Sequence, residues 1–176
     1  MMKQFTGLVF LCIISFFSIG GNANSSLISD LCKHCDDPKL CLSTIKSRPE
    51  SGEFAATNNQ IEIIAISVAS SDASATSAYI KEKLSHEDLE PATEATFEDC
   101  QKNYQDAVEQ LDDSISAMLT DAHADVDVWL HAAISAIESC DTELESRGGN
   151  DAELSKRNEV FLKLCKNALV INKMLT

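Results

Sequence analysis

The stretch FEDCQKNYQDAVEQLDDSISAM, residues 97–118, carries an apolar residue at every third or fourth position. Steps of three and four place these residues on one side of an α-helix and the polar residues between them on the other side. The apolar side consists of Phe97, Cys100, Tyr104, Ala107, Leu111, Ile115 and Met118. The stretch therefore predicts a long helix that packs along one face.

Three more segments show the same spacing, at residues 61–84, 126–144 and 154–175. In the first of them, the predicted buried stripe consists of Ile61, Ile64, Val68, Ala75, Tyr79 and Leu84. Beyond residue 54 the chain has a single proline, and its only glycines are Gly148 and Gly149, so little interrupts these helices. Four stripes joined by short polar links predict an all-α fold, with an antiparallel four-helix bundle over residues 53–176.

Residues 1–23 have the composition of a secretory signal peptide. A short charged start precedes an apolar run at residues 8–19, which is too short to span a bilayer comfortably. Gly21 and Ala23 stand at the −3 and −1 positions expected of a cleavage site. The mature chain would begin at Asn24, which starts the only Asn-x-Ser/Thr sequon and is a candidate for glycosylation. A secreted, extracellular protein is expected.

The chain is strongly acidic, with a net charge of −14. Such a charge repels nucleic acid and anionic membranes and speeds encounter with a basic partner, although it also favours solubility alone. We find no stretch after the signal peptide that is long and apolar enough to span a membrane. We therefore expect a monomer that contacts neither nucleic acid nor membrane.

Two cysteines of the predicted bundle have a mirror arrangement. Cys100 and Cys140 lie on the apolar stripes of consecutive helices, and the midpoint between them, residue 120, is where the connecting turn must fall. Residues equally far from the turn of an antiparallel pair lie at the same height. The spacing therefore predicts a Cys100–Cys140 disulfide. Cys165 has no such mirror partner and is expected to be a free, partly buried thiol.

Three cysteines and a histidine crowd the stretch CKHCDDPKLC at residues 32–41. Apolar residues lie on both sides of this cluster, and the run RPESG at residues 48–52 ends the segment. We interpret residues 24–52 as two short helical pieces folded into an N-terminal α-hairpin, with a bend at residues 36–38.

The cluster allows several pairings. A disulfide between Cys32 and Cys41 would bridge the two arms of the hairpin and is favoured. A Cys32–Cys35 redox pair is one alternative, and a metal site that includes His34 is another, although it would be cramped and lacks a second CxxC motif. A link from this cluster to Cys165 also stays open.

The polar side of the helix predicted at residues 97–118 is a candidate partner-binding face, because an acidic face could meet a basic rim around an enzyme cleft. A solvated face of an acidic protein is the alternative. Its candidate contact residues are Glu98, Lys102, Gln105, Glu109 and Asp112. Trp129, on the next helix, is expected to fill a helix seam, and an exposed position would make it a candidate for a dominant contact.

Motifs of catalysis are missing from the sequence. It contains no Gly-x-Ser-x-Gly, no HExxH and no glycine-rich phosphate loop. We therefore predict no catalytic residue, no metal and no cofactor, and regard the protein as a binding protein. A small helical lipid carrier is a weaker alternative, because the stripes suit close helix packing.

Three motifs, taken in order, resemble the plant invertase and pectin methylesterase inhibitor family over essentially the whole mature chain. The first is a pair of cysteines with eight residues between them and a proline three before the second, as in Cys32, Pro38 and Cys41. The second is Cys-x-x-x-Tyr-x-x-Ala-x-x-x-Leu at residues 100–111, and the third is WLHAAI at residues 129–134 leading to Cys140.

The resemblance implies a secreted four-helix bundle with an N-terminal hairpin. It implies disulfides at the positions of Cys32–Cys41 and Cys100–Cys140, and a cysteine at the position of Cys165 that is often unpaired. Cys35 departs from the family pattern. Members of the family bind cell-wall or vacuolar carbohydrate enzymes, cover the active-site cleft and have no catalytic activity of their own.

The target enzyme is harder to predict. Invertase inhibitors of this family commonly carry Pro-Lys-Phe in the approach to the third bundle helix, where this chain has His123-Ala124-Asp125. Pectin methylesterase inhibitors instead lay the faces of several helices across the pectin groove. We therefore expect a reversible one-to-one complex with a pectin methylesterase in the plant cell wall (apoplast), with acid invertase as the alternative target.

Overall fold

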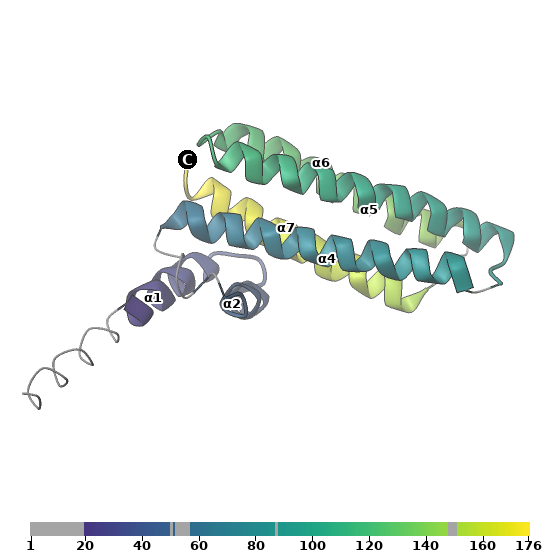
Figure 1. The fold of residues 1–176 in the computed structure, drawn as a ribbon, viewed down its shortest axis with the longest axis horizontal. Coiled ribbons are helices and arrows are strands. Elements are labelled where there is room, and N and C mark those ends of the chain that lie inside the picture. The colour runs from purple at the N-terminus through teal and green to yellow at the C-terminus, as the bar shows by residue number, and fades with distance from the viewer. Residues whose placement is uncertain (1–19, 50, 52–56, 87, 148–150) are drawn as a thin grey trace, which may run out of the picture.

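The computed structural model describes residues 20–49, 51, 57–86, 88–147 and 151–176 (Figure 1). Two short helices come first, α1 (Gly20–Cys32) and α2 (Pro38–Lys46). Four long helices follow, α4 (Asn58–His86), α5 (Pro91–Met118), α6 (His123–Arg147) and α7 (Ala152–Lys173). Most of the predicted signal peptide, residues 1–19, lies outside the described residues.

The four long helices form a bundle in which each one contacts two neighbours. α5 lies against α4 and α6, and α7 lies against the same two helices on their other sides. Because short links join consecutive helices, neighbours in sequence run antiparallel. α1 and α2 pack together and lie against α4 and α7 (Figure 1). The predicted antiparallel four-helix bundle with an N-terminal α-hairpin is confirmed.

Local sequence signals fix where several helices begin. Pro38 and Pro91 occupy the first turn of α2 and α5, where a backbone N–H has no helical partner and φ is already suitable. The Asp37 carboxylate caps α2 by accepting a hydrogen bond from the N–H three residues later, at 2.9 Å. Asp151 caps α7 in the same way, at 2.7 Å. Such caps typically stabilise a helix by about 1 kcal/mol each.

An aromatic pair and a polar chain occupy the middle of the bundle. Tyr104 and Phe161 are fully buried and meet edge to face, with their ring centroids 5.9 Å apart. The Tyr104 hydroxyl donates a hydrogen bond to Oδ1 of Asn158 at 2.7 Å, and Nδ2 of Asn158 donates to Oδ1 of Asp141 at 2.6 Å. This chain links α5, α7 and α6, and its buried polar atoms are paired, which makes the packing specific.

α4 buries two faces, which blurs its periodicity. The face toward the bundle core follows heptad steps and consists of Glu62, Ile66, Ala69, Ala73, Thr76 and Ile80. Another face meets the hairpin, where Ala65 lines a small cavity together with Cys41 and Ile45. Ala75, which the sequence predicted to be buried, is exposed. The predicted stripe follows the hairpin side, and the hairpin covers only the first part of α4 (Figure 1).

The length and composition of α4 correct one prediction. Within the described residues, the segment Asn58–Ser85 is long and apolar enough to cross a membrane by length and composition, although the sequence was expected to contain no such stretch. In the folded chain, 44% of its apolar window is buried. A core helix of a bundle passes the same test, so α4 alone does not indicate a membrane protein.

Two disulfides join helices that lie side by side. Cys100 of α5 is bonded to Cys140 of α6, with a Cα–Cα distance of 4.9 Å. Cys32 of α1 is bonded to Cys41 of α2, with a Cα–Cα distance of 5.5 Å. These are the pairs that the sequence favoured. The described residues also include two buried cysteines without a disulfide, Cys35 and Cys165.

A buried asparagine fastens the hairpin to the bundle. Oδ1 of Asn167, on α7, accepts a hydrogen bond from the N–H of Asp37 at 3.3 Å. Nδ2 of the same side chain donates to the Asp37 carbonyl at 3.3 Å. The Arg48 guanidinium adds a hydrogen bond to the carbonyl of Ser67, on α4, at 3.4 Å. The hairpin is therefore held by polar contacts at its bend and its end, besides its apolar packing.

Candidate binding surface

The predicted contact residues form one exposed stripe along α5. Positions in steps of four and three lie one above another on a helix surface, and the side chains of all five are exposed. The stripe consists of Glu98, Lys102, Gln105, Glu109 and Asp112. The opposite side of α5 is buried in the bundle at Phe97, Cys100, Tyr104, Ala107, Leu111 and Met118, whereas Ile115 is only partly buried. The amphipathic pattern of α5 therefore presents these groups to solvent.

Asp99 changes the charge balance of this stripe, and sequence reasoning missed it. Its carboxylate accepts a hydrogen bond from Nη1 of Arg147, on α6, at 2.8 Å and another from Nζ of Lys102 at 3.2 Å. Both contacts, that of Arg147 first, lower the pKa of the Asp99 carboxyl. Lys102, the one cation of the stripe, is therefore paired with Asp99. Glu98, Glu109 and Asp112 give the stripe its negative charge.

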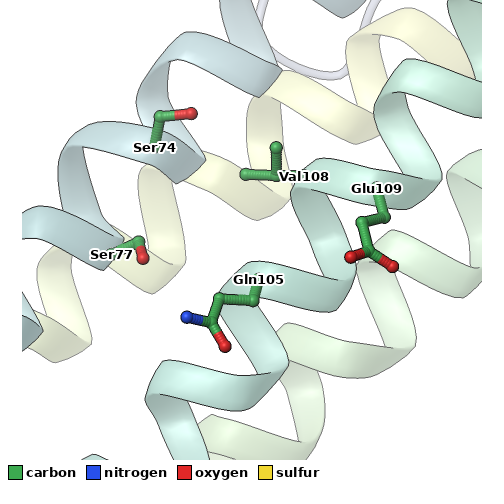
Figure 2. A pocket seen from close by; sticks show the side chains of 5 residues that line it. All are labelled: Ser74, Ser77, Gln105, Val108 and Glu109. Atoms are coloured by element: carbon green, nitrogen blue, oxygen red, sulfur yellow. The ribbon is translucent and has the colours of Figure 1, made fainter.

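A groove of about 440 Å³ borders the stripe on the α4 side. Figure 2 shows Ser74 and Ser77 of α4 opposite Gln105 and Val108 of α5, and Glu109 of α5 also lines the groove. The hollow forms where serine and alanine dominate α4, at residues 69–78, because small side chains leave the seam unfilled. Two stripe residues, Gln105 and Glu109, therefore belong to the wall of a concave surface.

On the other neighbour of α5, an apolar side chain faces solvent. Val128 of α6 is 60% exposed, although the buried residues Val126 and Leu130 lie two positions away on each side. Val128 was not among the predicted contact residues, although its position off the apolar stripe of α6 already indicated an exposed side chain. Trp129, which was predicted to fill a seam, is only half-buried. Aromatic side chains such as Trp129 are more usual anchors of protein interfaces than valine is.

The start of α6, at His123-Ala124-Asp125, is fixed to the end of α7. Nδ1 of His123 lies 3.0 Å from Oδ1 of Asn172, and Nδ2 of Asn172 donates to the His123 carbonyl at 2.9 Å. The preceding turn contains Leu119, which is 74% exposed, and Asp121 with a φ of 54°. The Oδ1 of Asp121 accepts a hydrogen bond from Nδ2 of Asn59 at 2.8 Å, which ties the turn to α4.

The cysteine cluster does not form a metal site. Within the described residues, no group of three or more His, Cys, Asp or Glu side chains is placed to hold a metal ion. His34 is exposed, whereas Cys35 is buried. Burial, and secondarily the charge of Asp36, raises the pKa of the Cys35 thiol to about 11. Burial also raises the pKa of Cys165. Asn24, the candidate glycosylation residue, lies in α1.

The protein is thus a disulfide-linked helical bundle with an N-terminal hairpin, and its acidic surface contains a groove between α4 and α5. A family model described as "Plant invertase/pectin methylesterase inhibitor" matches residues 26–171. The chain belongs to this family, whose members are inhibitors and not enzymes. The motifs at residues 32–41, 100–111 and 129–140 thus indicated the correct family.

Known proteins agree with this membership. A curated pectinesterase inhibitor from Actinidia deliciosa is 25% identical over 153 residues, which cover 87% of this chain and 81% of that protein. A mutant form of a pectin methylesterase inhibitor from Arabidopsis superposes with a TM-score of 0.71 at 16% identity, covering 84% of this chain and 95% of that one. A second Arabidopsis inhibitor structure gives 0.65 at 17% identity, with 86% and 97% covered. At these identities the structures show the fold alone.

Proposed function

We propose that this protein is secreted into the plant cell wall and inhibits a pectin methylesterase by covering its active-site cleft in a reversible one-to-one complex. The family and the curated pectinesterase inhibitor support this target. The chain also lacks the Pro-Lys-Phe tripeptide common in invertase inhibitors and has His123-Ala124-Asp125 in its place. Removal of residues 1–23 as a signal peptide would deliver the bundle outside the cell.

The observation that carries the proposal is the surface centred on α5. The acidic stripe of α5, the groove toward α4 and the exposed Val128 of α6 lie on three consecutive helices that pack side by side. The negative charge of the stripe and the concave seam that borders it fit a partner whose cleft has a basic rim. Charge of this kind acts mainly on the association rate and the specificity.

The proposal is tested with purified mature protein in two assays. In the first, a plant pectin methylesterase releases methanol from methyl-esterified pectin, and in the second, a plant acid invertase releases hexose from sucrose. We expect methanol release to fall to background near one inhibitor per enzyme, with a complex of that stoichiometry in size-exclusion chromatography. Suppression of hexose release alone would make invertase the target, and suppression of neither would contradict inhibition as the function.

A further inference from the structure

Three sulfur atoms meet at the bend of the hairpin. Cys32 and Cys41 form the disulfide, and the free Sγ of Cys35 lies 3.6 Å from Sγ of Cys41. All three residues are buried. A third sulfur at this distance from a disulfide is a potential nucleophile toward it, because exchange begins when a thiolate attacks a disulfide sulfur.

The backbone of the bend produces this arrangement. α1 ends at Cys32, and the N–H of Cys35 then donates a hydrogen bond to the Cys32 carbonyl at 3.1 Å, which folds the chain back by one tight turn. α2 begins at Pro38, and its first turn brings Cys41 to the same place, with the Cys41 N–H bonded to the Asp37 carbonyl at 3.0 Å. Cys41 thus faces two cysteines of the other arm.

Contacts with the bundle hold the third thiol in place. Sγ of Cys35 lies 3.7 Å from the carbonyl oxygen of Asn167 and 4.0 Å from that of Leu31, and either oxygen can accept the weak hydrogen bond of the single S–H group. The side chain of the same Asn167 forms two hydrogen bonds with the backbone of Asp37. Within the described residues, Cys165 makes no comparable contact with a disulfide sulfur.

We propose that Cys35 is an internal nucleophile of the hairpin, through which the disulfide migrates from Cys32–Cys41 to Cys35–Cys41 inside the folded protein. The Cys35 thiol loses its proton, and its sulfur attacks Sγ of Cys41. The new S–S bond forms while the old one breaks, and the electron pair leaves on Sγ of Cys32, which takes up one proton. The number of disulfides is unchanged, and the step needs neither oxidant nor reductant.

Migration would release α1 from its covalent link to α2. Cys32 becomes a free thiol, and α1 then keeps its place through buried side chains such as Ile28 and Leu31 alone. The rate depends on pH, because only the thiolate attacks and burial raises the pKa of Cys35 to about 11. The Cys32–Cys41 bond is therefore locked in acid and becomes exchangeable as the pH rises.

Trypsin separates the three cysteines cleanly, which makes the migration measurable. Cleavage after Lys33, Lys39 and Lys46 puts each cysteine on a different peptide. The full-length mature protein is incubated at several values between pH 7 and pH 10 without redox reagents. It is then acidified, unfolded, alkylated with a maleimide at low pH, and mapped by mass spectrometry without reduction.

We expect peptide 34–39 to become linked to peptide 40–46 while Cys32 becomes labelled. The initial rate should rise about tenfold per pH unit in this range, since the thiolate fraction does so below the thiol pKa. Cys165→Ser should leave the rate unchanged, and Cys35→Ser should abolish labelling of Cys32. If Cys32 stays unlabelled at pH 10 while the Cys100–Cys140 link persists, the proposal is wrong.

A pair of variants tests the new bond directly, in a Cys165→Ser background. Cys35→Ser leaves Cys32 and Cys41, which should close their disulfide during air oxidation. Cys32→Ser leaves Cys35 and Cys41, and we expect it also to show no free thiol after unfolding. Two free thiols in Cys32→Ser, under conditions in which Cys35→Ser has none, would overturn the proposal.

Discussion

The bundle and the hairpin each contain one disulfide, but they are stabilised in different ways. Cys100–Cys140 connects two long helices whose buried faces run their whole length, and it adds to a core that contains Tyr104 and Phe161. Cys32–Cys41 connects one short helix to another, and α2 has only nine residues. An isolated helix of that length is unstable in water, so the stability of the hairpin depends on its disulfide and its docking contacts.

The difference implies that damage to the bundle is global and damage to the hairpin is local. Each bundle helix packs against two others in a ring of four, so the loss of one helix–helix contact lowers the stability of the whole bundle. Among the described residues, the hairpin touches α4 and α7 and no other bundle helix. We therefore expect the hairpin to open while the bundle persists, as low-stability segments of other proteins do.

Removal of the bundle disulfide should have the largest effect. Cys100→Ser with Cys140→Ser opens a loop with a sequence separation of 40, which on the chain-entropy estimate costs about 4 kcal/mol. We expect the free energy of unfolding, measured with urea, to fall by this order for the whole protein. A loss confined to one helix in hydrogen exchange would contradict the cooperative bundle.

The second-largest effect should be a dependence of stability on pH that is caused by the buried Glu62. This residue is 0% exposed in the core face of α4, and within the described residues its carboxylate oxygens have no hydrogen-bond partner. Burial raises its pKa to about 8. The folded state therefore binds more protons than the unfolded state between about pH 4.5 and pH 8, and stability falls as pH rises through that window. Burial raises the pKa of Asp72 and Asp141 in the same direction.

Glu62→Gln should remove most of this dependence. The variant should gain on the order of 3 kcal/mol over the wild-type protein at pH 8 and little at pH 4.5, since the amide carries no charge to bury. Thermal unfolding at both pH values measures the gain, and Glu82→Gln on the exposed side of α4 is the matched control. An equal shift at both pH values would mean that ionisation of Glu62 is not the cause.

Removal of the hairpin disulfide should cause a smaller loss of stability, and the loss should be confined to the hairpin. Serine at Cys32, Cys35 and Cys41 together removes the bond and any replacement for it. Closing a loop of separation nine contributes roughly 2–3 kcal/mol. We expect amide exchange in α1 and α2 to accelerate about a hundredfold, with core amides of α5 and α6 unchanged. Equal acceleration in all helices would remove the distinction between the two regions.

The smallest of these effects concerns the amide that docks the hairpin. Asn167→Ala leaves the backbone of Asp37 without its partner, which should cost about 1–2 kcal/mol and again affect only the hairpin. Asn158→Ala is the matched substitution in the bundle, where it deprives the Tyr104 hydroxyl of its acceptor. Proteolysis of the hairpin should increase for the first variant, and the midpoint of global unfolding should fall for the second.

Sequence patterns predicted the parts of this molecule that depend on regular spacing. The Cys100–Cys140 pair followed from its symmetry about the turn, and the α5 stripe followed from the polar positions of one helix. α4 resisted this treatment, because it packs against the bundle on one face and the hairpin on another. Its apolar residues therefore do not form one stripe, and Glu62 in the core was missed.

Other features needed three dimensions. The ion pairs of Asp99 join α5 to α6, and the groove at Ser74 depends on how closely α4 approaches α5. The contact between Cys35 and Cys41 depends on the tight turn after α1. Spacing alone left the partners of Cys35 open for that reason.

The central claim is that the α5 surface binds the target enzyme. Its most direct test compares two double variants of equal net charge in the pectin methylesterase assay. Glu98→Lys with Glu109→Lys reverses charge on the stripe, and Glu82→Lys with Glu145→Lys does so at exposed positions on α4 and α6. We predict that the first weakens inhibition by about tenfold or more, chiefly through slower association, and that the second stays within about threefold of the wild-type protein. Equal inhibition by the two variants would contradict the claim.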